Sequence, residues 1–338
     1  MKKSVVALAL ASAFSGAAYA DSAINIYGIV DMGLVRETGG TAGAVNKLTS
    51  GAQSGTRLGF KGTEDLGDNL KALFVLETGI AADAGGFNQT NTAFARQSFV
   101  GLQNDWGTLT LGRQYTAYFL TLSQVADPFA AGMAGASQNL MLPLAAVEPD
   151  RAIRMNNAVK YASPVFNNFS GELAYGFGEV AGVSGGSSVV SGSVGYSMDP
   201  VNVRLAYYRK NNAADTDNLS SVMLAANWDF KVAKLFAAYA DNDALANGKT
   251  RDVLIGATVP FGKHTFIASY INKDDRGTLN QDANQAALGY TYELSKRTNF
   301  YAAWARIDNK RGATYKVGNN SEPGTGDKAF NLGIRHIF

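Results

Sequence analysis

The chain offers few residues for covalent or metal chemistry. It has no cysteine and two histidines, His264 and His336, which excludes disulfides, thiolate metal sites and a cysteine nucleophile. A serine hydrolase would need one of these histidines beside a serine and an acid, but His336 lies in the terminal segment and His264 lies at a tight turn. No Asp-x-Asp-x-Asp-Gly loop offers a calcium site. The sequence therefore disfavours an enzyme and predicts neither a cofactor nor a metal.

The first twenty residues have the pattern of an export signal. Lys2 and Lys3 precede a short apolar run over 5–14, and Ala18-Tyr19-Ala20 is a small-x-small cleavage site. We predict a signal peptide over residues 1–20 and one mature domain over 21–338. Removing the two lysines lowers Lys+Arg from 30 to 28 against 28 Asp+Glu, so the formal net charge falls from +2 to about zero. A balanced charge argues against a nucleic-acid partner, which requires a basic excess.

Most of the remaining chain alternates between apolar and polar residues, as half-buried β-strands do. Leu58 and Phe60, for example, lie on a face opposite to Arg57 and Lys61. In the segment that follows, the pattern assigns Phe99 to the apolar face and Arg96 to the polar face. These positions need a scaffold that has one apolar and one polar side.

The number and connections of the alternating segments indicate an all-β, antiparallel transmembrane barrel. About sixteen strands of about ten residues are joined by tight turns at one rim and by long polar loops, such as 211–218 and 308–327, at the other. No stretch after residue 20 approaches the roughly 18–20 apolar residues of a transmembrane helix, and only helices and closed barrels can span a membrane. A soluble β-sandwich also alternates, and it is the alternative fold.

One long segment, Gln114 to Arg154, interrupts the strand pattern. Pro128, Pro143 and Pro149 break it, yet it contains several methionines and leucines. A connection of this length in a compact domain is normally functional. Because the segment is too apolar for a solvated tail, we expect it to fold into the mouth of the barrel and narrow it. The alternative is a long surface loop.

Several motifs resemble those of the Gram-negative trimeric general porins, most closely the β-proteobacterial type. They are Asn25-Ile26-Tyr27-Gly28-Ile29-Val30-Asp31, Arg57-Leu58-Gly59-Phe60-Lys61-Gly62-Thr63-Glu64-Asp65-Leu66-Gly67, Arg96-Gln97-Ser98-Phe99-Val100-Gly101-Leu102 and Leu111-Gly112-Arg113. The resemblance covers the whole mature chain. It implies a homotrimer of sixteen-stranded barrels in the outer membrane, with an inward third loop that falls on Gln114 to Arg154. The ending with His336 and Phe338 resembles the assembly signal of that family.

The resemblance also implies an electric field across the narrowest part of the pore. In that family, basic residues stand on the barrel wall and acidic residues face them from the inward loop. The basic positions are Arg57, Arg96 and Arg154, extended by Lys61 and Lys160, and the acidic ones are Glu77, Asp127, Glu148, Asp150 and Asp31. Ile29 stands where enteric members have a basic residue on the first strand, so a fourth basic wall position is in doubt.

These observations lead to the hypothesis of a passive channel in the outer membrane. Its partners would be outer-membrane lipid, lipopolysaccharide and small hydrophilic solutes and ions, and the arginines would give it an anion preference. Compensation by the acids listed above would instead leave the pore nearly neutral or weakly cation-selective. A second hypothesis is an adhesin or structural barrel that acts through its long loops. Single-channel conductance distinguishes these two functions.

Overall fold

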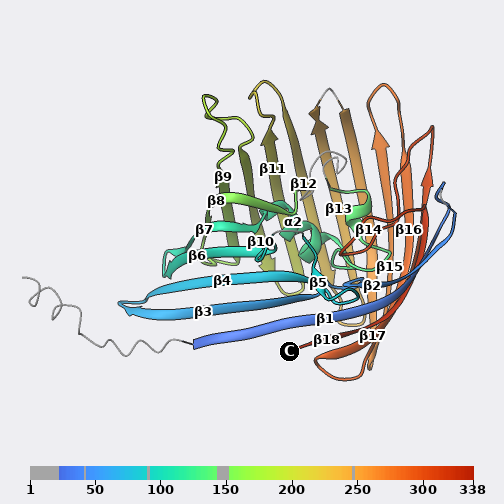
Figure 1. Cartoon of the computed structure of the whole chain (residues 1–338), viewed down its shortest axis with the longest axis horizontal. Coiled ribbons are helices and arrows are strands. Elements are labelled where there is room, and N and C mark those ends of the chain that lie inside the picture. Colours follow the sequence, from blue (N-terminus) through green and yellow to red (C-terminus); the bar gives the residue numbers. More distant parts are fainter. Residues whose placement is uncertain (1–22, 42, 90–91, 143–151, 246–247) are drawn as a thin grey trace, which may run out of the picture.

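The computed structural model describes residues 23–41, 43–89, 92–142, 152–245 and 248–338, and these residues form a closed antiparallel barrel (Figure 1). None of the described helices is long and apolar enough to span a membrane. The strands are β1 (Ala23–Thr38), β2 (Val45–Ser50), β3 (Arg57–Gly67), β4 (Leu70–Ala81), β5 (Gly86–Phe87), β6 (Gln97–Asn104), β7 (Gly107–Tyr115), β8 (Arg154–Ala162), β9 (Phe169–Gly176), β10 (Val189–Met198), β11 (Val201–Asn211), β12 (Asn218–Asp229), β13 (Lys234–Ala244), β14 (Gly248–Phe261), β15 (His264–Asp275), β16 (Ala283–Glu293), β17 (Thr298–Asn309) and β18 (Lys328–Ile337).

The described part of the barrel wall has sixteen strands, as predicted. β2 and β3 both pair with β1 and together form one wall strand, whereas β5 pairs only with the end of β4. The other strands pair with their neighbours in chain order, and β1 pairs with β18, which closes the ring. Turns of two residues, such as that between β3 and β4, stand at one rim, and longer connections stand at the other.

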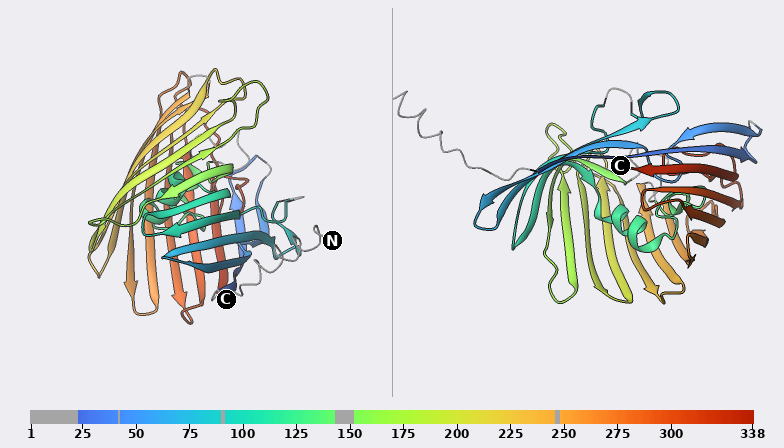
Figure 2. Two further views of the ribbon diagram at one scale, coloured as in Figure 1. Left: turned by 90° about the vertical axis from the view of Figure 1, so that its left-hand side faces the viewer. Right: turned by 90° about the horizontal axis from the view of Figure 1, so that it is seen from below.

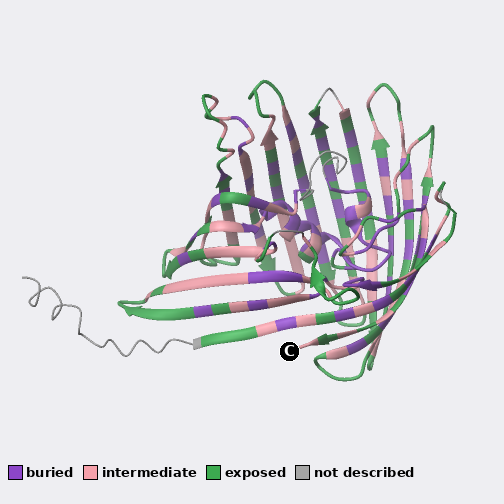
Figure 3. Ribbon diagram, in the orientation of Figure 1, coloured by how far each residue is buried: buried purple, intermediate pink, exposed green. Residues whose placement is uncertain are grey.

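Exposed and buried residues alternate along the strands, as the bands in Figure 3 show. The outward positions carry large apolar side chains, for example Leu224, Ile255 and Leu288, which are 51%, 58% and 60% exposed. Most inward positions carry small or polar side chains or pack against the connection between β7 and β8 inside the barrel. An apolar outer face and a polar interior are the pattern of a transmembrane β-barrel.

The alternation was misassigned at β6. Val100 and Leu102 of β6 are the outward residues, at 55% and 48% exposed. Phe99 therefore faces the lumen, together with its cross-strand partner Val75. Arg96 precedes β6 and reaches the lumen from a strand end, so its position does not follow from the strand's alternation. The error arose because an aromatic residue was assumed to face lipid.

The connection between β7 and β8, hereafter the inward loop, is described over residues 116–142 and 152–153, and these residues enter the barrel as predicted. It begins with the short helix α2 (Ala117–Thr121), continues as the π-helical turn η1 (Leu122–Ala126) and includes the 3-10 turn η2 (Ser137–Asn139). Thr116 is the N-cap of α2, and its side-chain oxygen accepts a hydrogen bond from the Phe119 amide. Both views in Figure 2 place these helical turns within the ring of strands.

The C-terminal residue contributes to the seam where the barrel closes. The amide of Gly28 donates to the Phe338 carbonyl and the amide of Phe338 donates to the Gly28 carbonyl, each at 3.1 Å. A Cβ at Gly28 would lie 2.4 Å from the Phe338 ring, so the ring covers this glycine. His336 is exposed, and its Nδ1 lies 2.8 Å from the Thr298 hydroxyl.

We expect Phe338→Asp to prevent insertion into the outer membrane, because a carboxylate cannot replace an aromatic ring that covers the seam. The measurement is the amount of heat-modifiable protein in outer-membrane fractions. Phe261→Asp is the matched control, since Phe261 is 74% exposed at a turn away from the seam. Normal amounts of heat-modifiable Phe338→Asp protein would contradict an assembly role for this residue.

Candidate functional site: the constriction of the barrel

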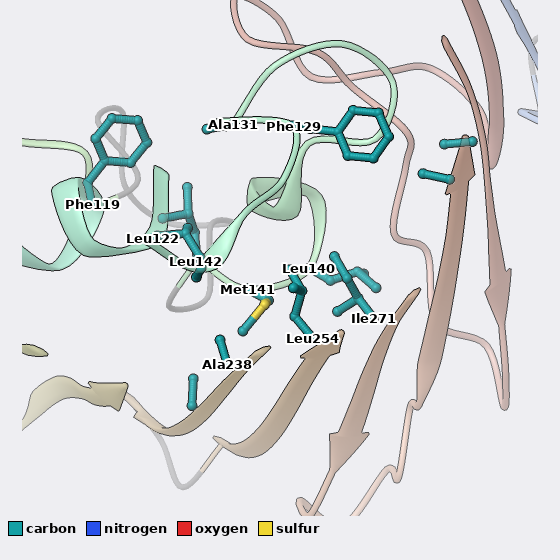
Figure 4. Packing of buried hydrophobic residues seen from close by; sticks show 14 of the residues in the cluster. Phe119, Leu122, Phe129, Ala131, Leu140, Met141, Leu142, Ala238, Leu254 and Ile271 are labelled. Atoms are coloured by element: carbon teal, nitrogen blue, oxygen red, sulfur yellow. The ribbon is translucent and has the colours of Figure 1, made fainter. Parts of the chain in front are cut away.

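The inward loop packs on one side of the barrel interior. Its side chains Tyr118, Leu140 and Met141 are fully or almost fully buried, as are Leu254 of β14 and Ile271 of β15. These residues belong to one apolar cluster between the loop and the wall (Figure 4). The methionines and leucines of this segment, which argued against a solvated loop, are thus among the residues that pack the loop against the wall.

Three wall side chains hold the backbone of the inward loop by hydrogen bonds. Asn227 Nδ2 of β12 donates to the Val125 carbonyl at 2.9 Å, and Gln285 Nε2 of β16 donates to the Gly135 carbonyl at 3.2 Å. Lys273 Nζ of β15 donates to the Leu140 carbonyl at 2.8 Å. A buried carbonyl without a donor is costly, so these contacts fix the path of the loop across the lumen.

Asp127 lies inside the inward loop rather than on its pore-facing surface. It is 3% exposed, and its carboxylate accepts hydrogen bonds from the amides of Phe129, Ala131 and Ser137 at 2.8, 3.0 and 2.8 Å. Burial raises the pKa of Asp127, and the three amide donors oppose that rise. The residue thus closes the tight turn of the loop, and the structure does not place it opposite the wall arginines.

Three arginines from separate strand ends meet on the opposite wall around Tyr115 and Glu77. Arg96 Nε donates to Glu77 Oε1 at 2.7 Å, and Arg57 Nη1 lies 3.8 Å from the same oxygen. Arg96 Nη2 and Arg154 Nη2 donate to the Tyr115 hydroxyl at 2.5 and 3.2 Å. The Arg154 guanidinium also lies 4.8 Å from the centre of the Tyr115 ring. Among the described residues, Glu77 therefore joins Arg57 to Arg96, and Tyr115 joins Arg96 to Arg154.

The two lysines of the predicted basic set differ in their surroundings. Lys61 is exposed, and its ammonium lies 5.3 Å from the centre of the Tyr27 ring, whose hydroxyl donates to Glu77. Lys160 Nζ forms an ion pair with Glu172 Oε2 at 2.5 Å. The charge of Lys160 is therefore locally balanced, whereas Lys61 adds a positive charge on the same face of β3 as Arg57, four residues further along the strand.

A cavity of about 360 Å³ separates the arginines from the inward loop. The three arginines line one side, and Phe119, Leu120, Ser123 and Gln124 line the loop side. Residues 319–323, between β17 and β18, complete the lining. Among the described lining residues the single carboxylate is that of Glu322, which is 2.9 Å from Lys47 Nζ. The described loop surface that faces the arginines is thus uncharged.

Of the remaining predicted acids, Asp31 does not line this cavity. Asp31 is fully buried, and its carboxylate accepts the amides of Gln53 and Ser54 at 2.8 and 2.5 Å and the Tyr301 hydroxyl at 2.6 Å. It therefore anchors the segment between β2 and β3. Glu148 and Asp150 lie outside the described residues. Among the described residues, no three His, Asp or Glu side chains are grouped as metal ligands.

Shortening the inward loop tests its role as the constriction. Replacing residues 132–142 with a short Gly-Ser linker removes the turn that crosses the lumen, so we expect a higher single-channel conductance and entry of larger sugars. Conductance in planar bilayers and liposome swelling with sugars of increasing size measure the two effects. Unchanged permeability in a variant that still folds as a heat-modifiable barrel would show that this segment does not limit the pore.

Comparison with known proteins identifies the family. Residues 7–312 match the family model of the Gram-negative porins. The chain belongs to this family. Outer membrane porin protein 32 of Delftia acidovorans is 33% identical, with 100% of both chains covered. The anion-selective porin from Comamonas acidovorans has a TM-score of 0.82 at 29% identity, covering 94% of this chain and 100% of that one.

A more distant structure agrees in fold. In-vitro folded OmpT of Vibrio cholerae, in its trimer form, has a TM-score of 0.70 at 17% identity and covers 94% of this chain and 99% of that one. The family match and the relatives at 33% and 29% identity show that this porin is an outer-membrane protein that forms a channel. Its family and fold are those of non-enzymatic channels.

Sequence reasoning missed the residues that position the arginines and the backbone of the inward loop. Tyr115, which joins two arginines, was read only as the start of the long segment, and Lys273, Asn227 and Gln285 were not connected with the loop. A polar residue at an inward strand position is the one available signal, but it does not say whether the side chain meets water or a loop carbonyl.

Proposed function

We propose that this porin passes small hydrophilic anions in preference to cations. The observation that carries the proposal is the set of permanent positive charges at the cavity, which the guanidinium groups of Arg57, Arg96 and Arg154 line. Glu77 pairs with the first two of these groups. Among the described lining residues the single carboxylate is that of Glu322, which is paired with Lys47. A few charges at a narrow, low-dielectric passage act strongly on passing ions because field lines are focused there.

The comparisons support the same direction. The Comamonas structure, which is 29% identical to this chain, is described as anion-selective. We further propose that residues 1–20 are a cleaved signal peptide, that residues 21–338 are the mature domain and that three copies assemble in the outer membrane among lipid and lipopolysaccharide. The environments of the histidines support a channel without enzymatic activity, since His264 contacts Tyr290 and Tyr292 and His336 contacts Thr298.

The reversal potential of the purified porin in a planar bilayer under a KCl gradient tests the anion preference. We expect a sign that corresponds to chloride carrying most of the current at low salt. The preference should weaken as salt rises, because the Debye length falls from about 30 Å at 0.01 M to about 3 Å at 1 M. A reversal potential of the opposite sign at low salt would overturn the proposal.

A further inference from the structure

The lumen wall carries an apolar patch directly beside the arginine cluster. It consists of Leu73 and Val75 of β4 and Phe99 of β6, hereafter the lumen patch. The strand register places Val75 opposite Phe99, and Glu77, two residues further along β4, opposite Gln97. Residues two apart on a strand share a face, so Leu73 and Val75 lie on the same side of the wall as Glu77.

The burial of the neighbouring residues gives the same orientation. Val100 of β6 and its partner Phe74 occupy the other face, and Val100 is 55% exposed on the outside of the barrel. The lumen patch residues are half-buried, and none belongs to the apolar cluster beneath the inward loop. In Figure 3 the first part of β4 is accordingly coloured as intermediate. These side chains are thus partly open to the lumen.

The lumen patch is unusual for its position. The interior of a transmembrane barrel that conducts water and ions is normally polar, and the residues paired with the patch across β3 are Lys61 and Thr63. Apolar surface that remains in water costs free energy in proportion to its area. A passing solute that covers this surface would recover part of that cost.

The distance between the patch and the positive charges sets the separation between the carboxylate and the apolar body of such a solute. Val75 lies one same-face step from Glu77, which is about 7 Å along a strand, and Glu77 holds Arg57 and Arg96. Lys61 stands directly across from Val75. An anion whose carboxylate meets these cations can lay an apolar body a few ångströms long on the patch.

We propose that the lumen patch and the arginines together make the channel selective for monoanions with an apolar body, such as aromatic carboxylates. The proposal rests on the anion preference proposed above. The cations attract the carboxylate, and Val75 and Phe99 contact the ring while the solute passes. A small hydrophilic anion such as acetate meets the same charges but covers little of the patch.

Bi-ionic reversal potentials of the purified porin test this selectivity, with potassium benzoate or potassium acetate opposite potassium chloride at equal concentration. In a featureless pore the larger benzoate ion would be the slower of the two. We expect a benzoate-to-acetate permeability ratio above one. In Val75→Thr/Phe99→Gln the ratio should fall about fourfold, which is the effect of covering one methylene group's worth of apolar surface.

A matched control and an independent readout make the outcome unambiguous. Phe261→Gln alters an aromatic residue that is 74% exposed at the end of β14, away from the patch, and should leave the ratio unchanged. Should the double variant fail to fold, Val75→Thr alone and benzoate-induced current noise in the wild type provide the same test.

The two proposals fail in different ways. A KCl reversal potential without anion preference overturns the proposed function. Intact anion preference with a benzoate-to-acetate ratio below one, or a ratio that the patch substitutions do not lower, overturns the selectivity for apolar anions alone.

Discussion

Replacing Arg57, Arg96 and Arg154 together with alanine is expected to abolish the anion preference of the channel and to leave a weak cation preference. The substitution removes three permanent positive charges, because arginine stays protonated at any relevant pH. Among the described residues Glu77 is then the charge nearest to the removed guanidinium groups, since Lys160 is paired with Glu172 and Lys61 lies further along β3. Focused charge in a cleft enriches counter-ions by about tenfold or more at low ionic strength, so the anion-to-cation permeability ratio should fall by at least about tenfold.

Two further variants define the origin of this effect. Arg204→Ala is the matched control, because Arg204 also faces the lumen but is held by the hydroxyls of Ser193 and Ser170 away from the cluster. It should change the KCl reversal potential little. Glu77→Gln leaves the arginines and removes their carboxylate, so the anion preference should rise. If the triple alanine variant keeps the wild-type reversal potential, these arginines do not set the selectivity.

The barrel was predictable because its physical causes are local in sequence. Each strand needs an apolar face toward lipid and a polar face toward the lumen, so apolar and polar residues alternate along each strand segment. Tight turns at one rim mark where neighbouring strands begin and end. The alternation failed at Phe99, where the lumen itself is apolar. The alternation places Arg57 on the lumen face of β3. It is a weaker guide for Arg96 and Arg154, because Arg96 lies just before β6 and Arg154 is the first residue of β8.

The candidate site was predictable only in part, because its geometry depends on contacts between distant residues. The motif positions identified four candidate residues that the structure places together, namely Arg57, Arg96, Arg154 and Glu77. Asp127 has the residue type of a constriction acid, but its carboxylate satisfies amides of its own loop. Whether an acid faces a pore or a backbone turn depends on how the loop folds, and no spacing in the sequence encodes that.

The deepest contact of this kind is a buried ion pair behind the inward loop. Lys273 and Asp252 are 2% and 0% exposed, and Lys273 Nζ lies 2.8 Å from Asp252 Oδ1. Asn242 Nδ2 donates to Asp252 Oδ2 at 2.8 Å, and Lys273 Nζ also donates to the Leu140 carbonyl at 2.8 Å. The pair thus couples the stability of the wall to the position of the constriction.

Lys273→Met is expected to destabilise the barrel by about 3–5 kcal/mol, because it leaves the Asp252 carboxylate buried without its cation. It also removes the donor to the Leu140 carbonyl, so the inward loop should fluctuate. The temperature at which the protein loses its heat-modifiable form measures the first effect, and single-channel current noise measures the second.

A double variant separates these two effects. Lys273→Met/Asp252→Asn removes the uncompensated charge and should recover most of the lost stability, yet the Leu140 carbonyl still lacks its donor and the current noise should persist. Lys231→Met is the matched control, because the Lys231–Asp199 pair is exposed and screened by solvent, and it should change neither measurement. Current noise at the wild-type level in the double variant would show that the apolar contacts of Leu140, Met141 and their neighbours hold the loop without the lysine.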